Sequence, residues 1–440
     1  MRQLSPQFRC GSVAMRDKFL ACILLISLGC ADPSAPWEDS GATIARNARG
    51  AIVGINLTDT AAADLRLPQL ATLPHLTTLT LGASVGDADL VHLKSLGQLQ
   101  RLYLADTQVT AAGLMHLSAL KLRQIDVPTR ARTDVGLKYM MSAMEPAEAL
   151  DLTGWQVSDP GLAVLRKWPE LRHLSLKNTA VGDEGVSHLK ALRQLAYLGL
   201  GATKTTDFGM AHLAQLQGLR RLFLSGTVVT SRGMAHLSGL TQLERLTLEG
   251  TQVGDAGLAE LAPLIGLQRL SLEGTAVTDT GLMHLRQMRD LEVLVLSHSQ
   301  VTDSGLAHLQ GLSSLKSLGL GGLAITDQGL FHLKALDKLE HLYLNRTQIS
   351  DAGVAHVARL PRLKLLYLSS NPLTNAGVAH LVDARNLELL YLNGTQITDE
   401  GLPYLEKLAR LKVLVLIETD TTMPAVARLR KSLSGCVIHR

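Results

Sequence analysis

Leucine residues recur along this chain as Leu-x-Leu pairs, and each pair is followed by the same spacing of apolar and polar positions. Counted from the second leucine of a pair, apolar residues stand at +5, +10, +13 and +16; after Leu272 these are Val277, Leu282, Leu285 and Met288. The pair alternates with the period of a short strand, and the later spacing of three gives one face of a helix or tight helical turn. The pattern therefore predicts one repeated unit of strand and helix.

Sixteen such units follow one another between residues 50 and 417. From Leu152 onwards the step is 24 residues without exception, and earlier steps of 23 and 25 place irregularities near Ser84, Lys121 and Met144. A repeat of this kind predicts a solenoid, which grows without needing a new core, and its neighbouring strands should pair in parallel. The reference residues are Leu57, Leu81, Leu104, Val127, Leu152, Leu176, Leu200, Leu224, Leu248, Leu272, Leu296, Leu320, Leu344, Leu368, Leu392 and Leu416.

Polar residues recur at fixed places in the unit. Threonine at +3, such as Thr227, is expected to bond backbone groups that would otherwise be buried unpaired. The Thr-Asp pair before the helix, such as Thr278 and Asp279 at +7, is expected to cap it, because Ser, Thr and Asp can accept the free N–H groups of the first turn. Glycine at +9, such as Gly281, is expected to permit close approach of the adjacent coil. Each of these positions has a structural explanation within the repeat.

Histidine at +12 and aspartate at +7 form ladders that could suggest metal binding. Neighbouring helices pack about 8–10 Å apart, whereas zinc–nitrogen bonds are about 2.0–2.1 Å, so a shared metal would require the side chains to lean together. We therefore expect half-exposed helix positions, with no metal and no cofactor. The histidines are His92, His116, His188, His212, His236, His284, His308, His332, His356 and His380.

The residues at −3, −1 and +1 point away from the core if the strand alternates, and the repeat does not dictate their identity. Of the twelve aromatic residues from Gly50 onwards, six fall on these three positions out of 24. One interpretation is an aromatic ladder that stabilises the sheet, and the other is a recognition surface, because tyrosine is frequent in binding hot spots. The hypothetical binding residues are Tyr343, Tyr367, Tyr391, Val415, His341, Leu365, Leu389, Phe223 and Tyr103.

A second stripe on the same face carries charge. Arg221, Arg245 and Arg269 occupy −3 in consecutive units, and Glu249 and Glu273 occupy +1. The expected arrangement is a self-compensated charged surface.

The N-terminal segment resembles a secretory signal. Arg16, Asp17 and Lys18 precede the apolar run 19–28, which is too short to span a bilayer as a mature helix. The ending Ile-Ser-Leu-Gly-Cys resembles a bacterial lipobox, with Ser27 and Leu28 in exchanged order, and implies lipidation of Cys30. A plain cleaved signal and an uncleaved anchor are the alternatives, and either Met1 or Met15 could be the start.

The expected organisation has five parts. Residues 1–29 form a signal peptide and 30–41 a linker rich in proline, serine and acidic residues. A helix over 42–49 is expected to cover the N-terminal end of the core of repeats 50–417. Residues 418–440 are expected to cover the other end, with a helix over 423–433 and a short strand over 436–439.

The repeat pattern resembles the leucine-rich repeats of bacterial extracytoplasmic proteins and is similar to those of the ribonuclease inhibitor and of F-box substrate receptors. The resemblance covers about 85% of the chain and implies an α/β fold. This fold is a leucine-rich-repeat solenoid, or horseshoe, with a parallel sheet on the concave face and helices on the convex face. It also implies protein binding on the concave sheet. No F-box-like helical segment precedes the repeats.

Composition narrows the function. The net charge of the chain is +4, of which the signal segment carries +3, so the remainder is near neutral and gives no electrostatic case for nucleic acid. No phosphate loop, nucleophile elbow or zinc spacing occurs. We expect a monomeric, extracytoplasmic, lipid-anchored scaffold that binds a protein and is not an enzyme. The alternatives are a ligase-type effector or substrate receptor, for which Cys436 is the candidate nucleophile, and an envelope hydrolase.

Overall fold

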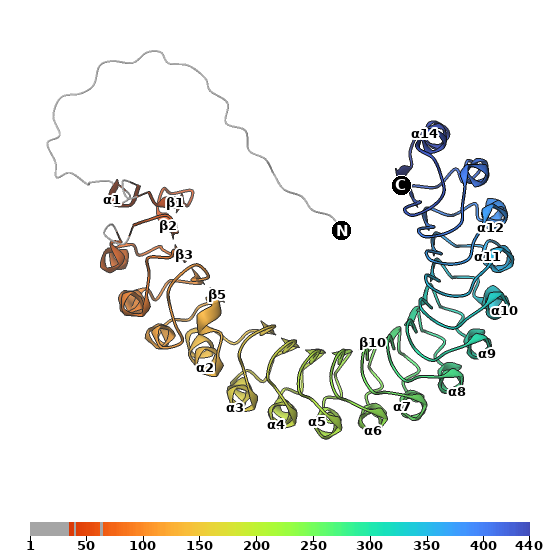
Figure 1. Cartoon of the computed structure of the whole chain (residues 1–440). Helices are drawn as coiled ribbons and strands as arrows, with labels where there is room; N and C mark the ends of the chain where they lie inside the picture. The colour runs from red at the N-terminus through yellow and green to blue at the C-terminus, as the bar shows by residue number, and fades with distance from the viewer. Residues whose placement is uncertain (1–34, 39–40, 62–64) are drawn as a thin grey trace, which may run out of the picture.

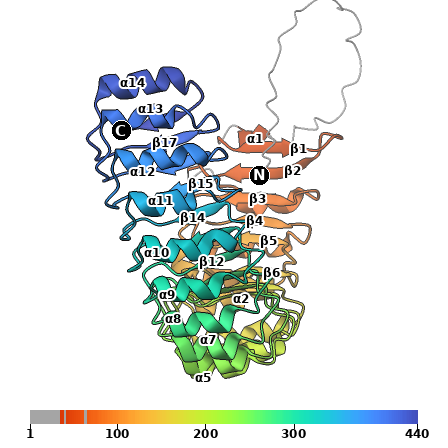
Figure 2. The same ribbon diagram turned by 90° about the vertical axis from the view of Figure 1, so that its right-hand side faces the viewer.

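The computed structural model describes residues 35–38, 41–61 and 65–440; the signal segment, most of the linker and Cys30 lie outside the described residues. The described chain forms an open horseshoe, with strands on its inner side and helices on its outer side (Figures 1 and 2). Helices α1 (Ala35–Glu38) and α14 (Met423–Ser432) lie at its two tips. The leucine-rich-repeat solenoid is confirmed.

Each of the sixteen units contributes one short strand to the concave face. These are β2 (Ile52–Leu57), β3 (Thr78–Leu81), β4 (Arg101–Tyr103), β5 (Gln124–Asp126), β6 (Ala149–Asp151), β7 (His173–Ser175), β8 (Tyr197–Gly199), β9 (Arg221–Phe223), β10 (Arg245–Thr247), β11 (Arg269–Ser271), β12 (Val293–Val295), β13 (Ser317–Gly319), β14 (His341–Tyr343), β15 (Leu365–Tyr367), β16 (Leu389–Tyr391) and β17 (Val413–Val415). Neighbouring strands pair in parallel and in register, as Leu246 does with Leu270.

Short α-helices cover much of the convex face. Besides α1 and α14 they are α2 (Asp134–Ala143), α3 (Asp159–Leu162), α4 (Asp183–Ser187), α5 (Asp207–Leu213), α6 (Ser231–Met234), α7 (Asp255–Leu261), α8 (Asp279–Leu282), α9 (Asp303–Leu306), α10 (Asp327–Leu330), α11 (Asp351–Val357), α12 (Asn375–His380) and α13 (Leu402–Leu405). None of the described helices has both the length and the apolar character needed to cross a membrane.

Tight 3-10 turns complete the convex layer. They are η2 (Leu67–Thr72), η3 (Asp87–Ser95), η4 (Gly113–Leu117), η5 (Thr129–Ala131), η6 (Ala163–Lys167), η7 (His188–Ala191), η8 (Ala235–Leu237), η9 (Met283–Leu285), η10 (Ala307–Leu309), η11 (Phe331–Ala335), η12 (Leu381–Asp383) and η13 (Asp399–Gly401). The spacing of three in the sequence corresponds to these tight turns and the short helices before them.

The leucines of the repeat form one continuous core between the two layers. Leu270 and Leu272 of one strand, together with Leu282 and Leu285 of the following helical segment, are at most 1% exposed. The threonine at +3 is buried beside them, and its hydroxyl donates to the carbonyl of the strand leucine, as Thr227 does to Leu224 at 2.7 Å. The predicted core position of the leucines and the predicted backbone hydrogen bond of the threonine are both confirmed.

The aspartate at +7 has a different role from the predicted helix cap. The cap is the preceding threonine, as where the Thr278 hydroxyl accepts from the backbone N–H of Thr280. The aspartate instead binds the next coil: the carboxylate of Asp279 accepts from the backbone N–H and the hydroxyl of Thr302, at 2.7 and 2.6 Å. Ten carboxylates bond Thr or Ser in this way, and together they are named the aspartate ladder: Asp87, Asp134, Asp183, Asp207, Asp255, Asp279, Asp303, Asp327, Asp351 and Asp399.

The glycine at +9 exists because of this ladder. A Cβ added to Gly209 would lie 2.5 Å from Oδ1 of Asp183, and one added to Gly233 would lie 2.6 Å from Oδ1 of Asp207. The glycine therefore permits the close approach of the adjacent coil, as predicted, at some cost in helix propensity.

The predicted helix over 42–49 is wrong. Residues Thr43–Arg46 form strand β1, which pairs antiparallel with β2 and covers the free edge of the first repeat. A hairpin turn joins the two strands: the Asn47 side chain accepts from the N–H groups of Arg49 and Ala51, and Gly50 has a φ of 78°. An exposed sheet edge with unpaired backbone groups favours a pairing strand over a short helix.

The C-terminal end has the predicted elements. Helix α14 ends at Ser432, and strand β18 (Val437–His439) pairs in parallel with β17. The Arg430 guanidinium donates to the carbonyl of Ile438 at 2.8 Å and joins the helix to the last strand. Together these elements cover the last repeat.

The repeat predicts that all neighbouring strands pair, but the sheet is interrupted between β5 and β6. Strands β1–β5 form one sheet and β6–β18 form another. The interruption coincides with the 25-residue step near Met144, where α2 runs for ten residues as an unbroken α-helix. The position that holds the buried leucines Leu122 and Leu171 in the flanking units holds Ala147 here. An extra residue and a smaller core side chain keep the two strands from pairing.

Candidate functional site

The tyrosines predicted as a recognition surface are stacked on the concave face of β14, β15 and β16. The ring centroids of Tyr343 and Tyr367 are 5.1 Å apart, and those of Tyr367 and Tyr391 are 3.8 Å apart with planes only 9° from parallel. Strand register causes this, because the three residues are direct partners in adjacent parallel strands. We name Tyr343, Tyr367 and Tyr391 the tyrosine stack.

Apolar residues extend the tyrosine stack on the side of the strand starts. Leu365 and Leu389 are half-buried and in register with His341. On the next strand Val415 is 6% exposed, and Ile417 beyond it is 43% exposed. The structure therefore places seven of the nine predicted binding residues on four neighbouring strands.

The environment of Tyr343 and Tyr367 raises the pKa of their hydroxyl groups. Burial raises the pKa of Tyr367 well above its usual range, and the hydroxyl of Tyr391 beside it raises it further. Burial likewise raises the pKa of Tyr343. Each tyrosine of the stack presents an apolar ring with a hydrogen-bonding tip, which suits recognition of a protein surface.

The other two predicted binding residues lie elsewhere. Tyr103 is on β4, in the five-stranded sheet, where its hydroxyl is 3.4 Å from the side-chain oxygen of Gln124. Phe223 is on β9, where its ring centroid is 4.9 Å from that of Tyr197, and the Arg245 guanidinium lies 5.0 Å from its centre. Tyr197 was not among the predicted binding residues; the signal in the sequence that pairs it with Phe223 is their diagonal placement at −3 and −1 of adjacent units.

The arginines at −3 form no ion pair with the glutamates at +1, although we expected the two groups to compensate each other. We name Arg221, Arg245 and Arg269 the arginine stripe. Among the ion pairs of the described residues, none within 4.0 Å joins this stripe to Glu249 or Glu273. The strand holds the two groups at its opposite ends. Burial, then Arg269 and Arg221, lower the pKa of Arg245, and Glu249 counteracts this less strongly.

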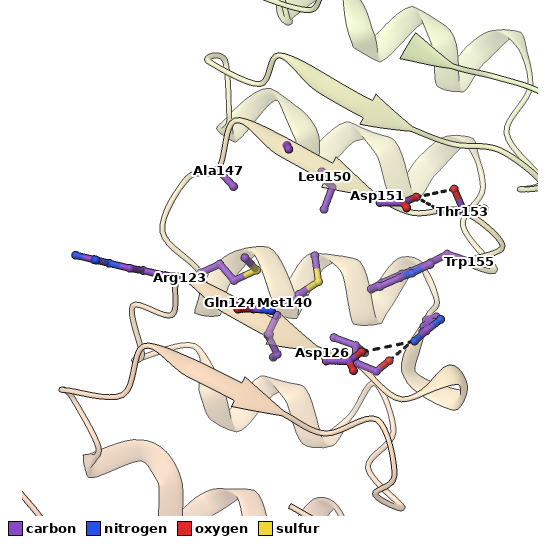
Figure 3. Close-up of a pocket in the computed structure, with 14 residues that line it drawn as sticks. Arg123, Gln124, Asp126, Met140, Ala147, Leu150, Asp151, Thr153 and Trp155 are labelled. Carbon is purple, nitrogen blue, oxygen red and sulfur yellow. Dashed lines mark hydrogen bonds and ion pairs between the residues drawn. The ribbon is translucent and has the colours of Figure 1, made fainter. Parts of the chain in front are cut away.

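A cleft opens where the sheet is interrupted. It has a volume of about 360 Å³ and lies between β5 and β6. Figure 3 shows Ala147 and Leu150 across the gap from Gln124, with Met140 of α2 between the strands. At the strand ends Asp126 is 3.7 Å from the guanidinium of Arg132. The cleft thus has an apolar interior and a polar rim, and the sequence signal for it was alanine in place of leucine.

Two histidines of the +12 ladder contact polar side chains of the preceding unit. Nδ1 of His308 lies 2.6 Å from the Arg286 guanidinium, and Nδ1 of His332 lies 3.0 Å from the Gln310 amide. Burial, followed by Arg286, lowers the pKa of His308. Among the described residues no group of three or more histidine, cysteine or acidic side chains is placed to hold a metal ion.

Cys436, the candidate nucleophile of the ligase alternative, is half-buried in the C-terminal cap. Burial raises the pKa of its thiol. A cysteine nucleophile needs a lowered pKa because the thiolate is the reactive form, so this environment disfavours that role.

Comparison with known proteins agrees with the fold. A family model described as "Leucine Rich repeat" matches residues 169–190 and 383–405. The crystal structure of an internalin (InlF) from Listeria monocytogenes is 26% identical, with a TM-score of 0.53 over 70% of this chain and 88% of that one. A leucine-rich-repeat protein of Leptospira interrogans is 19% identical, with a TM-score of 0.49 over 84% of this chain and 92% of that one. The comparison with curated proteins finds no match.

Proposed function

We propose that this chain is an extracytoplasmic scaffold that binds a protein partner through the concave face, with the tyrosine stack as the centre of recognition. The observation that carries the proposal is the stack itself. Its rings are half-buried, in contact with one another and continuous with Leu365 and Leu389. Leucine-rich-repeat scaffolds are typically protein-binding, and the concave face is the surface whose residues the repeat leaves free.

The size of the patch fits a hot spot within a larger interface. Four strands about 4.8 Å apart, each with three outward residues, cover roughly 200 Å². A standard interface buries about 800 Å² per partner, so further contacts on the concave face are needed. Truncating these tyrosines opens no core cavity, because their rings lie outside the leucine layer.

Capture from cell envelopes with wild-type and variant bait tests the proposal. The triple variant Tyr343→Ala, Tyr367→Ala, Tyr391→Ala should keep its circular dichroism and lose the captured partner about a hundredfold, equivalent to roughly 2.7 kcal/mol. The matched control is Phe208→Ala, Phe331→Ala, Tyr404→Ala, which removes three exposed aromatic residues from the convex face. Partner recovery within about twofold of wild type for the tyrosine variant would mean that the stack only stabilises the sheet.

The extracytoplasmic part of the proposal rests on the N-terminal sequence. The apolar run ending at Gly29 and Cys30 supports export and acylation of Cys30 as the mature N-terminus, with the scaffold attached to a membrane as a monomer. Mass spectrometry of protein from a bacterial host should find lipid on Cys30. An intact Met1 or Met15 terminus, or cleavage elsewhere without lipid, would refute it.

A further inference from the structure

Charged residues at −4 and at −3 of the repeat are arranged differently: those at −4 form ion pairs, and those at −3 lie beside like charges. At −4, carboxylates and cations of adjacent units pair: Lys316 with Glu292 at 2.6 Å, Lys364 with Glu340 at 2.8 Å and Lys412 with Glu388 at 2.6 Å. One residue further on, the arginine stripe places three like charges in direct register on β9, β10 and β11. The repeat can pair its charges, and at the arginine stripe it does not.

Like charges opposite one another on adjacent strands destabilise a sheet. Parallel strands lie about 4.8 Å apart, and the register places each arginine of the stripe directly beside another on the neighbouring strand. Among the described residues no acceptor binds the side chains of Arg221 and Arg269, both of which are exposed; Arg245 lies over the ring of Phe223. The arginine stripe is therefore a row of guanidinium groups whose N–H donors have no acceptor among the described side chains.

A depression adjoins the stripe, and two cations and one carboxylate are among the residues that line it. It has a volume of about 270 Å³ and exists because β8 and the turn after it carry Gly199 and Gly201 on the concave side. Its walls include Tyr197, Phe223, Arg245 and the exposed Lys177. Glu249 also lines it, at the same +1 position of its unit as Lys177, whereas Arg245 lines it from the start of its strand.

We propose that the arginine stripe binds an acidic segment of a protein partner, with a row of Asp or Glu carboxylates on the guanidinium groups of Arg221, Arg245 and Arg269. Arginine forms paired, charge-assisted hydrogen bonds with carboxylates, and a row of them relieves the repulsion between the three cations. This inference rests on the proposed function, since it names the chemistry of part of the partner. It concerns strands other than those of the tyrosine stack.

Fluorescence anisotropy with a fluorescein-labelled decaglutamate peptide tests the inference on the full chain. Wild type should bind it saturably and more weakly as salt rises toward about 0.15 M, because screening weakens exposed charge pairs. A decaglutamine peptide should not bind. The triple variant Arg221→Gln, Arg245→Gln, Arg269→Gln should lose at least about tenfold in affinity, or about 1.4 kcal/mol.

The −4 stripe supplies a control with the same loss of charge. Lys316→Gln, Lys364→Gln, Lys412→Gln removes three cations that already have carboxylate partners, and its affinity should stay within about twofold of wild type. An equal loss in both variants, or no saturable binding by wild type, overturns the inference. Should the arginine variant misfold, the single change Arg269→Gln at an exposed side chain gives the same test at smaller amplitude. Tyrosine-dependent capture of the partner is a separate measurement, so the inference can fail while the proposed function stands.

Discussion

The carboxylate of Asp255 accepts two hydrogen bonds from Thr278 in the next unit, one from its backbone N–H at 2.8 Å and one from its hydroxyl at 2.6 Å. The same pair of bonds recurs along the aspartate ladder. At these ten helix starts, neighbouring coils are thus joined by a charged acceptor as well as by the leucine core.

Replacing Asp255 with alanine should destabilise the array, whereas asparagine should be tolerated. Alanine leaves the Thr278 N–H without its acceptor and removes two charge-assisted bonds, at a cost of about 2–3 kcal/mol. The chain itself shows that asparagine suffices: Asn375 accepts from the Thr398 N–H at 2.9 Å and donates to its hydroxyl at 2.8 Å. Urea unfolding of both variants checks this. Equal urea midpoints for the alanine and asparagine variants would mean that the aspartate ladder contributes little to stability.

Gly281→Ala should destabilise the protein although alanine is the better helix former. A Cβ there would clash with Oδ1 of Asp255 and would lie 3.1 Å from its Cγ. In an open helix the same change would stabilise by about 1 kcal/mol. Combining it with Asp255→Ala removes the clashing carboxylate, so the double variant should be less destabilised than the sum of the single variants. Additive effects in thermal unfolding would show that the contact is not the reason for the glycine.

Acid should weaken the last rung of the ladder. The backbone N–H and then the hydroxyl of Thr422 lower the pKa of Asp399 below its ordinary value of 3.8. A carboxyl whose pKa is lowered by folding contributes stability that is complete above the unfolded value and is lost as pH falls through the folded one. Wild type should therefore lose more stability than Asp399→Asn between about pH 5 and pH 3. Parallel curves for the two proteins would contradict this.

Filling the cleft at the sheet interruption should stabilise the chain. Ala147 occupies a position where Leu122 and Leu171 are fully buried, so Ala147→Leu should add about 1–2 kcal/mol of apolar burial. Ala83→Leu, which adds the same side chain at an exposed site, should have no such effect. An unchanged or lower melting temperature for Ala147→Leu would show that the surrounding coils do not accommodate the leucine.

Much of this fold could be predicted because the same spacing of residues recurs in all sixteen units. The strand leucines, the buried threonine and the glycine at close approach each follow from local spacing. The role of Asp279 did not, because its partner Thr302 lies 23 residues away and a helix start offers the same side chain a plausible local acceptor role. The N-terminal strand was missed because the free edge of β2 decides it, although Asn47 and Gly50 are ordinary hairpin-turn residues.

The candidate site could be predicted only where it follows the repeat. Register alone brings Tyr343, Tyr367 and Tyr391 together, so their stacking was visible in the spacing. Whether Arg245 and Glu249 form an ion pair depends on how far their side chains extend along the strand, and the spacing of residues in the sequence does not give that distance. The cleft depends on one missing leucine and one added residue.

The interruption between β5 and β6 also determines how far a disturbance travels along the solenoid. In a linear array, cooperativity passes only through contacts between neighbours. At this junction the strand ladder is absent, and the two sides are joined by the leucine core, by the hydrogen bond from the Gln156 N–H to the Arg132 carbonyl and by the bonds of Asp134 with Ser158. Fraying that begins at the N-terminal end can therefore stop after four units, and the twelve units that carry the arginine stripe and the tyrosine stack stay folded. The junction thus separates the proposed recognition surface from the N-terminal end, where the proposed membrane tether would attach.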